Sequence, residues 1–122
     1  MHEMPFVMSL LREASEAAAR EGLTRITGLT VSVGALSGIE PECVDLYFET
    51  ASEGTPAEGA RITYRIVPAG LCCKKCGTKY DYDPRGARRQ ERDPFLCPVR
   101  GGDGVLIRGT GTETTLESLT GE

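Results

Sequence analysis

Apolar residues recur every three or four positions near the start of the chain, which is the spacing of one face of an α-helix. This periodicity predicts a helix over residues 4–21. Gly22 would end it, because glycine readily adopts the left-handed conformation that closes many helices. The residues on the predicted inner face are Met4, Val7, Leu11, Ala14 and Ala18. We therefore expect an amphipathic helix that packs against the rest of the domain.

Two later segments alternate apolar and polar residues, as half-buried β-strands do. They predict strands over residues 23–34 and 62–67. In the first strand, Leu29, Val31 and Val33 should be buried, and Thr30 and Ser32 should face solvent. Between the strands, Pro41 favours the first turn of a second helix, because its missing N–H needs no partner there. That helix should end at Gly54 and bury Val44, Tyr47, Phe48 and Ala51.

The regular pattern breaks at Pro68. Residues 71–103 are rich in Cys, Lys, Arg, Gly and Pro and follow no clean period, so we expect an insert too short to fold on apolar burial alone. Residues 105–107 and 112–119 then predict a last strand or hairpin. The order of elements predicts an α+β fold, in which a small two-layer domain has two helices on a roughly three-stranded mixed sheet.

Composition narrows the function. With 122 residues, 39% of them hydrophobic, the chain has room for one domain and a small appendage. The net charge of −4 argues against a duplex nucleic-acid binder that depends on phosphate neutralisation. The sequence shows no apolar run that could cross a bilayer and none of the features of a signal peptide. We therefore expect a cytoplasmic protein that binds neither membranes nor nucleic acid.

The chain has five cysteines, an odd number, and three of them lie within residues 72–76. In a reducing compartment such a cluster indicates a metal or redox site. Cys73 and Cys76 form a Cys-x-x-Cys-Gly knuckle, in which two intervening residues let both thiolates face one ion. After twenty intervening residues, Cys97 begins Cys-Pro-Val-Arg-Gly, close to the Cys-Pro-x-Cys-Gly half of a zinc knuckle. The spacing predicts an inserted zinc-knuckle subdomain.

Position 100 departs from that pattern, because Arg100 stays protonated and cannot bind a cation. The fourth ligand could be Cys72, Asp103, water or a group from another chain. Adjacent residues of an extended segment point in opposite directions, so Cys72 and Cys73 could hold one ion only by straining the turn. A thiol–disulfide couple is the alternative for Cys73 and Cys76, but such motifs start a helix in a βαβ unit.

His2 is the only histidine of the chain. Its ring nitrogen, its amide nitrogen and the amine of Met1 can form one chelate, and the amide of Glu3 can add a fourth nitrogen. Square-planar nitrogen coordination suits Ni(II) or Cu(II) rather than zinc. The amides must lose their protons to bind in this way, so the site should be sensitive to pH.

Three motifs together indicate a family. They are Met1-His2-Glu3 at the start, the segment 68–77 that enters the knuckle, and the segment 97–101 that leaves it. In these motifs, and over nearly its whole length, the chain resembles the HypA/HybF family of nickel-incorporation proteins, which assist [NiFe] hydrogenase maturation. The resemblance implies a nickel metallochaperone and not an enzyme.

The resemblance also implies how the chain divides its metals. His2 would be the ligand of a transient Ni(II), with Glu3 as its partner. Cys73, Cys76 and Cys97 match three of the four ligands of the family's structural Zn(II). Residues 1–70 and 104–122 would form the nickel-binding α/β domain, and residues 71–103 the zinc-binding knuckle subdomain. The implied partners are a GTPase nickel-maturation factor and the hydrogenase large subunit.

A different class of function is a zinc-ribbon module that binds a partner or nucleic acid. The insert has a local basic character but also interleaved carboxylates, and it has few aromatic residues on which bases could stack. A solvated charged loop is therefore the stronger interpretation. The charged residues concerned are Lys74, Lys75, Asp81, Asp83, Arg85, Arg88, Arg89, Glu91, Arg92 and Asp93.

Overall fold

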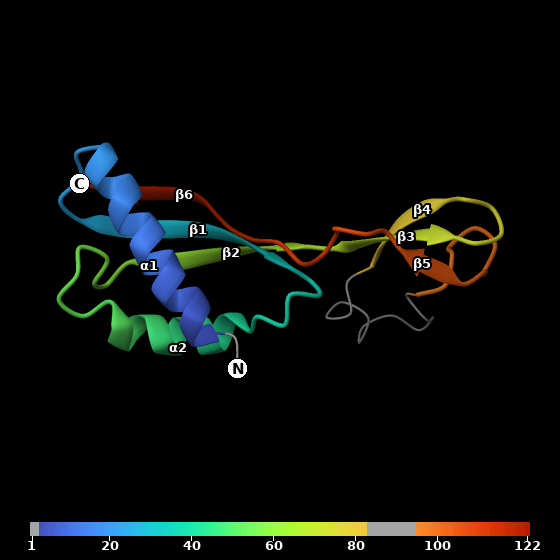
Figure 1. The fold of residues 1–122 in the computed structure, drawn as a ribbon, viewed down its shortest axis with the longest axis horizontal. Helices are drawn as coiled ribbons and strands as arrows, with labels where there is room; N and C mark the ends of the chain where they lie inside the picture. Colours follow the sequence, from blue (N-terminus) through green and yellow to red (C-terminus); the bar gives the residue numbers. More distant parts are fainter. Residues whose placement is uncertain (1–2, 83–94) are drawn as a thin grey trace. The chain divides into compact units, whose positions relative to one another are not determined.

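The structure, a computed structural model, describes residues 3–82 and 95–122. They form two helices and six strands, arranged in two three-stranded sheets of order β2-β1-β6 and β4-β3-β5 (Figure 1). The elements are α1 (Glu3–Arg20), β1 (Ile26–Gly34), α2 (Pro41–Ala51), β2 (Arg61–Val67), β3 (Ala69–Cys73), β4 (Lys79–Tyr82), β5 (Gly104–Leu106) and β6 (Thr114–Gly121).

The chain divides into two compact units, which we call the first and the second unit. The first unit comprises residues 1–32, 38–65 and 115–122, and the second comprises residues 33–37 and 66–114. The first unit therefore contains both helices and most of the β2-β1-β6 sheet, whereas the second contains the β4-β3-β5 sheet. Neither helix within the described residues has the length and hydropathy that a bilayer crossing requires.

The sheet of the first unit is mixed, as the sequence predicts. Backbone hydrogen bonds join Arg25 to Glu122 and Gly34 to Glu113, so β6 runs antiparallel to β1. At its other edge β1 meets the start of β2 near Gly28 and the end of β2 at Ala35, so these two strands run parallel. Figure 1 shows α1 crossing the strands, and α1 also contacts α2. The predicted α+β fold is confirmed.

The buried face of α1 follows the predicted period with one correction. Val7, Leu11, Ala14 and Ala18 are buried as expected. Met4 is 38% exposed, so its assignment to the inner face is wrong. Leu10 and Glu3 are buried instead, which turns the centre of the buried face away from Met4. α1 ends at Arg20, just before the predicted Gly22, which has a positive φ of 73°.

The second helix also forms where it is predicted, and it buries Val44 and Phe48. Tyr47 and Ala51 are only partly buried, because they lie at the edge of this face. The helix ends at Ala51 and not at Gly54, since Ser52 serves as the C-cap and its N–H donates to the carbonyl of Phe48. Sequence periodicity thus placed this helix correctly and misjudged its last turn.

The prediction that Ser32 faces solvent is wrong. Ser32 lies on the central strand of its sheet and is 5% exposed. Its hydroxyl donates to the carboxylate of Glu117, which also forms an ion pair with Arg65. Side chains from both neighbouring strands therefore cover Ser32, an arrangement that periodicity along a single strand does not reveal.

The second unit contains strands that were not predicted. β3 pairs antiparallel with β4, with Leu71 opposite Tyr80, and antiparallel with β5, with Leu71 opposite Leu106. The segments 105–107 and 112–119, predicted as a last strand or hairpin, do contain strands, β5 and β6. The hairpin alternative is wrong, because β5 and β6 belong to different sheets. Gly109 and Gly111 have positive φ angles and turn the chain between those sheets.

Candidate metal centre

Two turns of the second unit have the same local structure. In the turn of residues 73–77, the N–H of Gly77 donates to the carbonyl of Cys73 at 3.0 Å. In the turn of residues 97–101, the N–H of Gly101 donates to the carbonyl of Cys97 at 2.8 Å. Both glycines have positive φ, 74° and 68°. The final glycine of each knuckle motif thus supplies the left-handed residue that closes its turn.

Backbone amides in both turns are directed at sulfur. The N–H of Lys75 lies 3.3 Å from the Sγ of Cys73, and the N–H of Val99 lies 3.4 Å from the Sγ of Cys97. Arg100 adds a second amide to Cys97 Sγ, also at 3.4 Å. Backbone N–H groups placed in this way can support sulfur ligands from outside the metal's first coordination shell. The geometry of both turns is therefore that of turns that present sulfur to a metal ion.

The turns bring Cys73, Cys76 and Cys97 together. Their sulfur atoms all lie within 4.8 Å of one another, and those of Cys76 and Cys97 are 3.6 Å apart. Zn–S bonds of about 2.3 Å in a tetrahedron place sulfurs about 3.8 Å apart, so the three thiols fit one zinc ion. Within residues 3–82 and 95–122, no other group of three or more potential ligand side chains is found.

The three cysteines differ in exposure. Cys73 and Cys97 are each 3% exposed, whereas Cys76 is exposed to solvent. Hydrogen bonds from the side chain and backbone of Thr78, with smaller contributions from Cys97 and Cys73, lower the pKa of the Cys76 thiol to about 7. The Thr78 hydroxyl lies 3.0 Å from this sulfur. Because the thiolate is the form that binds metal, Cys76 is prepared for ligation near neutral pH.

Gly102 closes one side of the cluster. A Cβ atom at this position would lie 3.0 Å from the sulfur of Cys73 and 3.1 Å from the side chain of Lys75. The carbonyl of Gly102 accepts a hydrogen bond from the N–H of Cys97 at 2.9 Å, and that of Asp103 accepts one from Lys74 at 3.1 Å. Gly102 and Thr78 are not among the site residues predicted from the sequence. The Gly-Gly pair that ends the second turn was the available signal for Gly102.

Two residues considered as a fourth ligand do not belong to this group. Cys72 alternates with the buried residues Leu71 and Cys73 along β3, so its side chain points to the other face of the strand. Its sulfur lies 3.6 Å from the carbonyl of Gly77. Asp103 is exposed, and its carboxylate is also outside the group.

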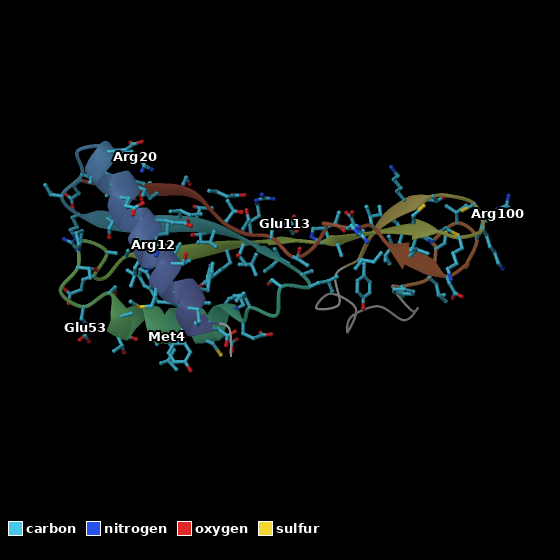
Figure 2. All side chains as sticks on the ribbon, viewed as in Figure 1. Met4, Arg12, Arg20, Glu53, Arg100 and Glu113 are labelled. Atoms are coloured by element: carbon cyan, nitrogen blue, oxygen red, sulfur yellow. The ribbon has the colours of Figure 1, made fainter. Side chains whose placement is uncertain are left out.

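Arg100, at the position where a knuckle has its last cysteine, is exposed as well. Figure 2 shows Arg100 at one end of the second unit. Its guanidinium group is thus directed to solvent, while its backbone keeps the conformation of the turn.

The redox alternative lacks its structural context. The Cys-x-x-Cys turn joins two antiparallel strands, β3 and β4, and is not the start of a helix after a strand. The cysteines of the chain are all free thiols. The arrangement within the described residues therefore fits a metal knuckle better than a thiol–disulfide couple.

Several other residues predicted from the sequence lie outside the described residues. His2 is among them, as are Asp83, Arg85, Arg88, Arg89, Glu91, Arg92 and Asp93. Glu3, the proposed partner of His2, is the first residue of α1 and is 8% exposed. A carboxylate in the first turn is favoured by the helix dipole. Lys74 and Lys75 are exposed.

Comparison with known proteins identifies the family. A family model described as "Hydrogenase/urease nickel incorporation, metallochaperone, hypA" matches residues 1–120. This chain belongs to the HypA family. The hydrogenase maturation factor HypA of Caldanaerobacter subterraneus subsp. tengcongensis is 37% identical over 119 residues, which cover 98% of this chain and 97% of that protein. The corresponding HypA of Syntrophus aciditrophicus is 34% identical over 113 residues, or 93% of this chain and 91% of that protein.

Solved structures of HypA proteins have the same fold. The solution structure of the Ni metallochaperone HypA from Helicobacter pylori covers 99% of this chain and 97% of its own, with a TM-score of 0.61 and 22% identity. A second HypA solution structure gives a TM-score of 0.63 with 23% identity, covering 100% of this chain and 97% of its own. These likenesses support the α+β architecture. The family description is that of a metallochaperone and not of an enzyme.

Proposed function

We propose that this protein is a nickel metallochaperone, which binds Ni(II) at its N-terminus and delivers it during [NiFe] hydrogenase maturation. The observation that carries the proposal is the match to the HypA family over residues 1–120, which includes both His2 and the two cysteine turns. Nickel is the cargo, whereas zinc at the cysteine turns is structural. The partners would be a GTPase nickel-maturation factor and the hydrogenase large subunit, in the cytoplasm.

The start of α1 supports a nickel site built from main-chain nitrogen. α1 begins at Glu3, and the first N–H groups of a helix have no acceptor within that helix. The amide of Glu3 is therefore not required by the helix. With Met1 as the N-terminal residue, its amine, the amide and imidazole of His2 and the amide of Glu3 supply four nitrogens. This ligand set suits square-planar Ni(II).

The cysteine turns support a structural role for zinc. Cys73 and Cys76 lie on one turn and Cys97 on another, so an ion held by all three would cross-link two segments far apart in the sequence. A cross-link of this kind stabilises a small unit that has few buried apolar side chains. Tight binding by thiolates keeps zinc in place, whereas a carrier must release its nickel. The two metals therefore need separate sites of different donor type.

Nickel binding by the zinc-loaded protein tests the proposal, with Met1 as the free N-terminus. Isothermal titration should give about one Ni(II) per chain, as one chelate requires, and His2→Ala should abolish that binding. Zinc content, measured by elemental analysis, should be the same in both proteins. Met4→Ala is the matched control, because Met4 is close to His2 in the sequence and is an exposed residue of the first turn of α1. If His2→Ala bound nickel as well as the parent does, the proposal would be wrong.

A second measurement addresses delivery. In cells that lack their own nickel-incorporation protein, the parent chain should restore hydrogenase activity and His2→Ala should not. Excess nickel in the medium should partly replace the function of the protein, because it bypasses a carrier. Restoration by His2→Ala at low nickel would contradict a role for the N-terminal chelate.

A further inference from the structure

We propose that zinc at Cys73, Cys76 and Cys97 has an exchangeable fourth coordination position, which a small imidazole or thiolate from solution can occupy. The inference rests on the proposed zinc site and concerns what completes it. Three observations carry it: the equivalence of positions 76 and 100, the placement of the remaining donor side chains, and the side of the cluster that faces solvent.

The two turns place residues 76 and 100 at equivalent positions. Each turn begins with a cysteine whose sulfur accepts a hydrogen bond from the backbone N–H two residues later. The carbonyl of the same cysteine accepts a hydrogen bond from the N–H of a glycine four residues later, and this glycine has a positive φ. Cys76 is the fourth residue of the first turn, and Arg100 is the fourth residue of the second. The chain therefore keeps the backbone of a ligand-bearing turn at position 100 while the side chain there cannot bind a cation.

Within residues 3–82 and 95–122, the other potential ligand side chains near the cluster do not supply the fourth ligand. The Cys72 side chain points to the opposite face of β3, and the Asp103 carboxylate lies outside the group of three sulfurs. The Thr78 hydroxyl is a neutral group, and it shares a hydrogen bond with the sulfur of Cys76. Zinc in proteins takes thiolate, imidazole or carboxylate ligands rather than a neutral hydroxyl. The remaining cysteine of the chain, Cys43, lies on α2 in the first unit.

Exposure shows that solvent can reach this position. Cys73 and Cys97 are buried, and the backbone of Gly102 packs against the sulfur of Cys73. Cys76 and Arg100 are both exposed. Zinc with three protein ligands and one open position is the arrangement found in sites that accept an external ligand. An ion already held by thiolates binds soft or borderline donors, so imidazole and small thiols are the expected class.

Cobalt substitution tests the inference. Co(II) replaces zinc in the His2→Ala protein, so that the N-terminal chelate does not contribute, and the visible ligand-field absorption is followed during titration with imidazole and, separately, with 2-mercaptoethanol. We expect a saturable spectral change with each ligand. Arg100→Cys should supply a fourth thiolate and abolish both changes. Cys72→Ser should behave like the parent.

Each other outcome contradicts a specific statement. Bound cobalt whose spectrum does not respond to either ligand would overturn the exchangeable position. Loss of the cobalt spectrum in Cys72→Ser would make Cys72 the fourth ligand and would also overturn it. Failure of the parent to bind cobalt or zinc would instead reject the proposed zinc site itself. If Arg100→Cys does not fold, X-ray absorption of the zinc-loaded parent in a buffer free of small thiols decides, because four sulfur scatterers then contradict the inference and three with one lighter atom support it.

Discussion

Each of the two units of the chain is stabilised by different interactions. The first unit buries apolar side chains from α1, β1 and α2. Among its described residues, which exclude 83–94, the second unit buries fewer, and two of these are potential metal ligands. The buried apolar residues of the first unit are Val7, Leu10, Leu11, Ala14, Ala18, Ile26, Leu29, Val31, Ile39, Val44, Phe48 and Ala57. Those of the second are Val33, Ala35, Ala69, Leu71, Cys73 and Cys97.

This difference indicates what each unit needs in order to fold. Each large apolar side chain that is fully buried contributes about 1.5–3 kcal/mol, which favours the first unit. A structural zinc ion contributes about 10–16 kcal/mol in small fully ligated domains, and three thiolates should supply part of that. The first unit should therefore fold without metal, and the second should depend on it.

The largest effect should come from loss of a zinc ligand. Cys97→Ser removes a buried sulfur that joins the second turn to the first, so the protein should lose its zinc and the ordered structure of the second unit. Amide NMR spectra should show collapsed signals for β3, β4 and β5 and dispersed signals for α1 and α2. Cys72→Ser is the matched control and should retain zinc. Uniform loss of structure in both units would contradict independent folding.

A truncated side chain in the core of the first unit should destabilise that unit and leave the zinc content unchanged. Leu10 is 2% exposed on α1, and Leu10→Ala should lower the free energy of unfolding of the first unit by about 2–5 kcal/mol. Urea denaturation followed by helical circular dichroism measures this change. Met8→Ala, on the exposed face of the same helix, should cost much less. Zinc content should remain that of the parent in both variants, and its loss in Leu10→Ala would show that the units are coupled.

A smaller effect is expected from crowding the sulfur cluster. Gly102→Ala places a methyl group against the sulfur of Cys73 and the side chain of Lys75, which must shift the second turn. Changes next to metal ligands typically weaken binding by about 10- to 100-fold, and we expect zinc affinity to fall within that range. Competition with a chromophoric chelator measures the affinity. Val99→Ala, at an exposed position in the same turn, should leave it unchanged.

The smallest effect concerns the surface of the first unit. Hydrogen bonds from Arg65 and Ser32 lower the pKa of Glu117, so this carboxylate stabilises the fold above its unfolded pKa, and the contribution is lost as pH falls through the folded value. Glu117→Gln should therefore lower the melting temperature slightly at neutral pH. The difference from the parent should disappear in strong acid. An equal difference at both pH values would show that the effect is not electrostatic.

Sequence reasoning succeeded where the signal is local. Three signals each lie within a short stretch of sequence: the apolar face of α1, the proline that opens α2 and the Cys-x-x-Cys spacing. The structure has both helices and brings the three cysteines together. Burial of Ser32 depends on Glu117, which is 85 positions away, so no local pattern contained it. The pairing of β3 with β5 was not predicted, because a strand of three residues is too short to show a recognisable alternation of apolar and polar residues.

The exposed sulfur of Cys76 has a practical consequence for anyone who purifies this protein. Without a bound ion, a solvent-accessible thiol 3.6 Å from the sulfur of Cys97 is open to oxidation, and the two are close enough to couple after a small shift. Air exposure of stripped samples should then lock the two turns together covalently and prevent reloading. These thiols should stay reduced and able to bind metal if a reductant that does not itself bind metal is present from lysis onward.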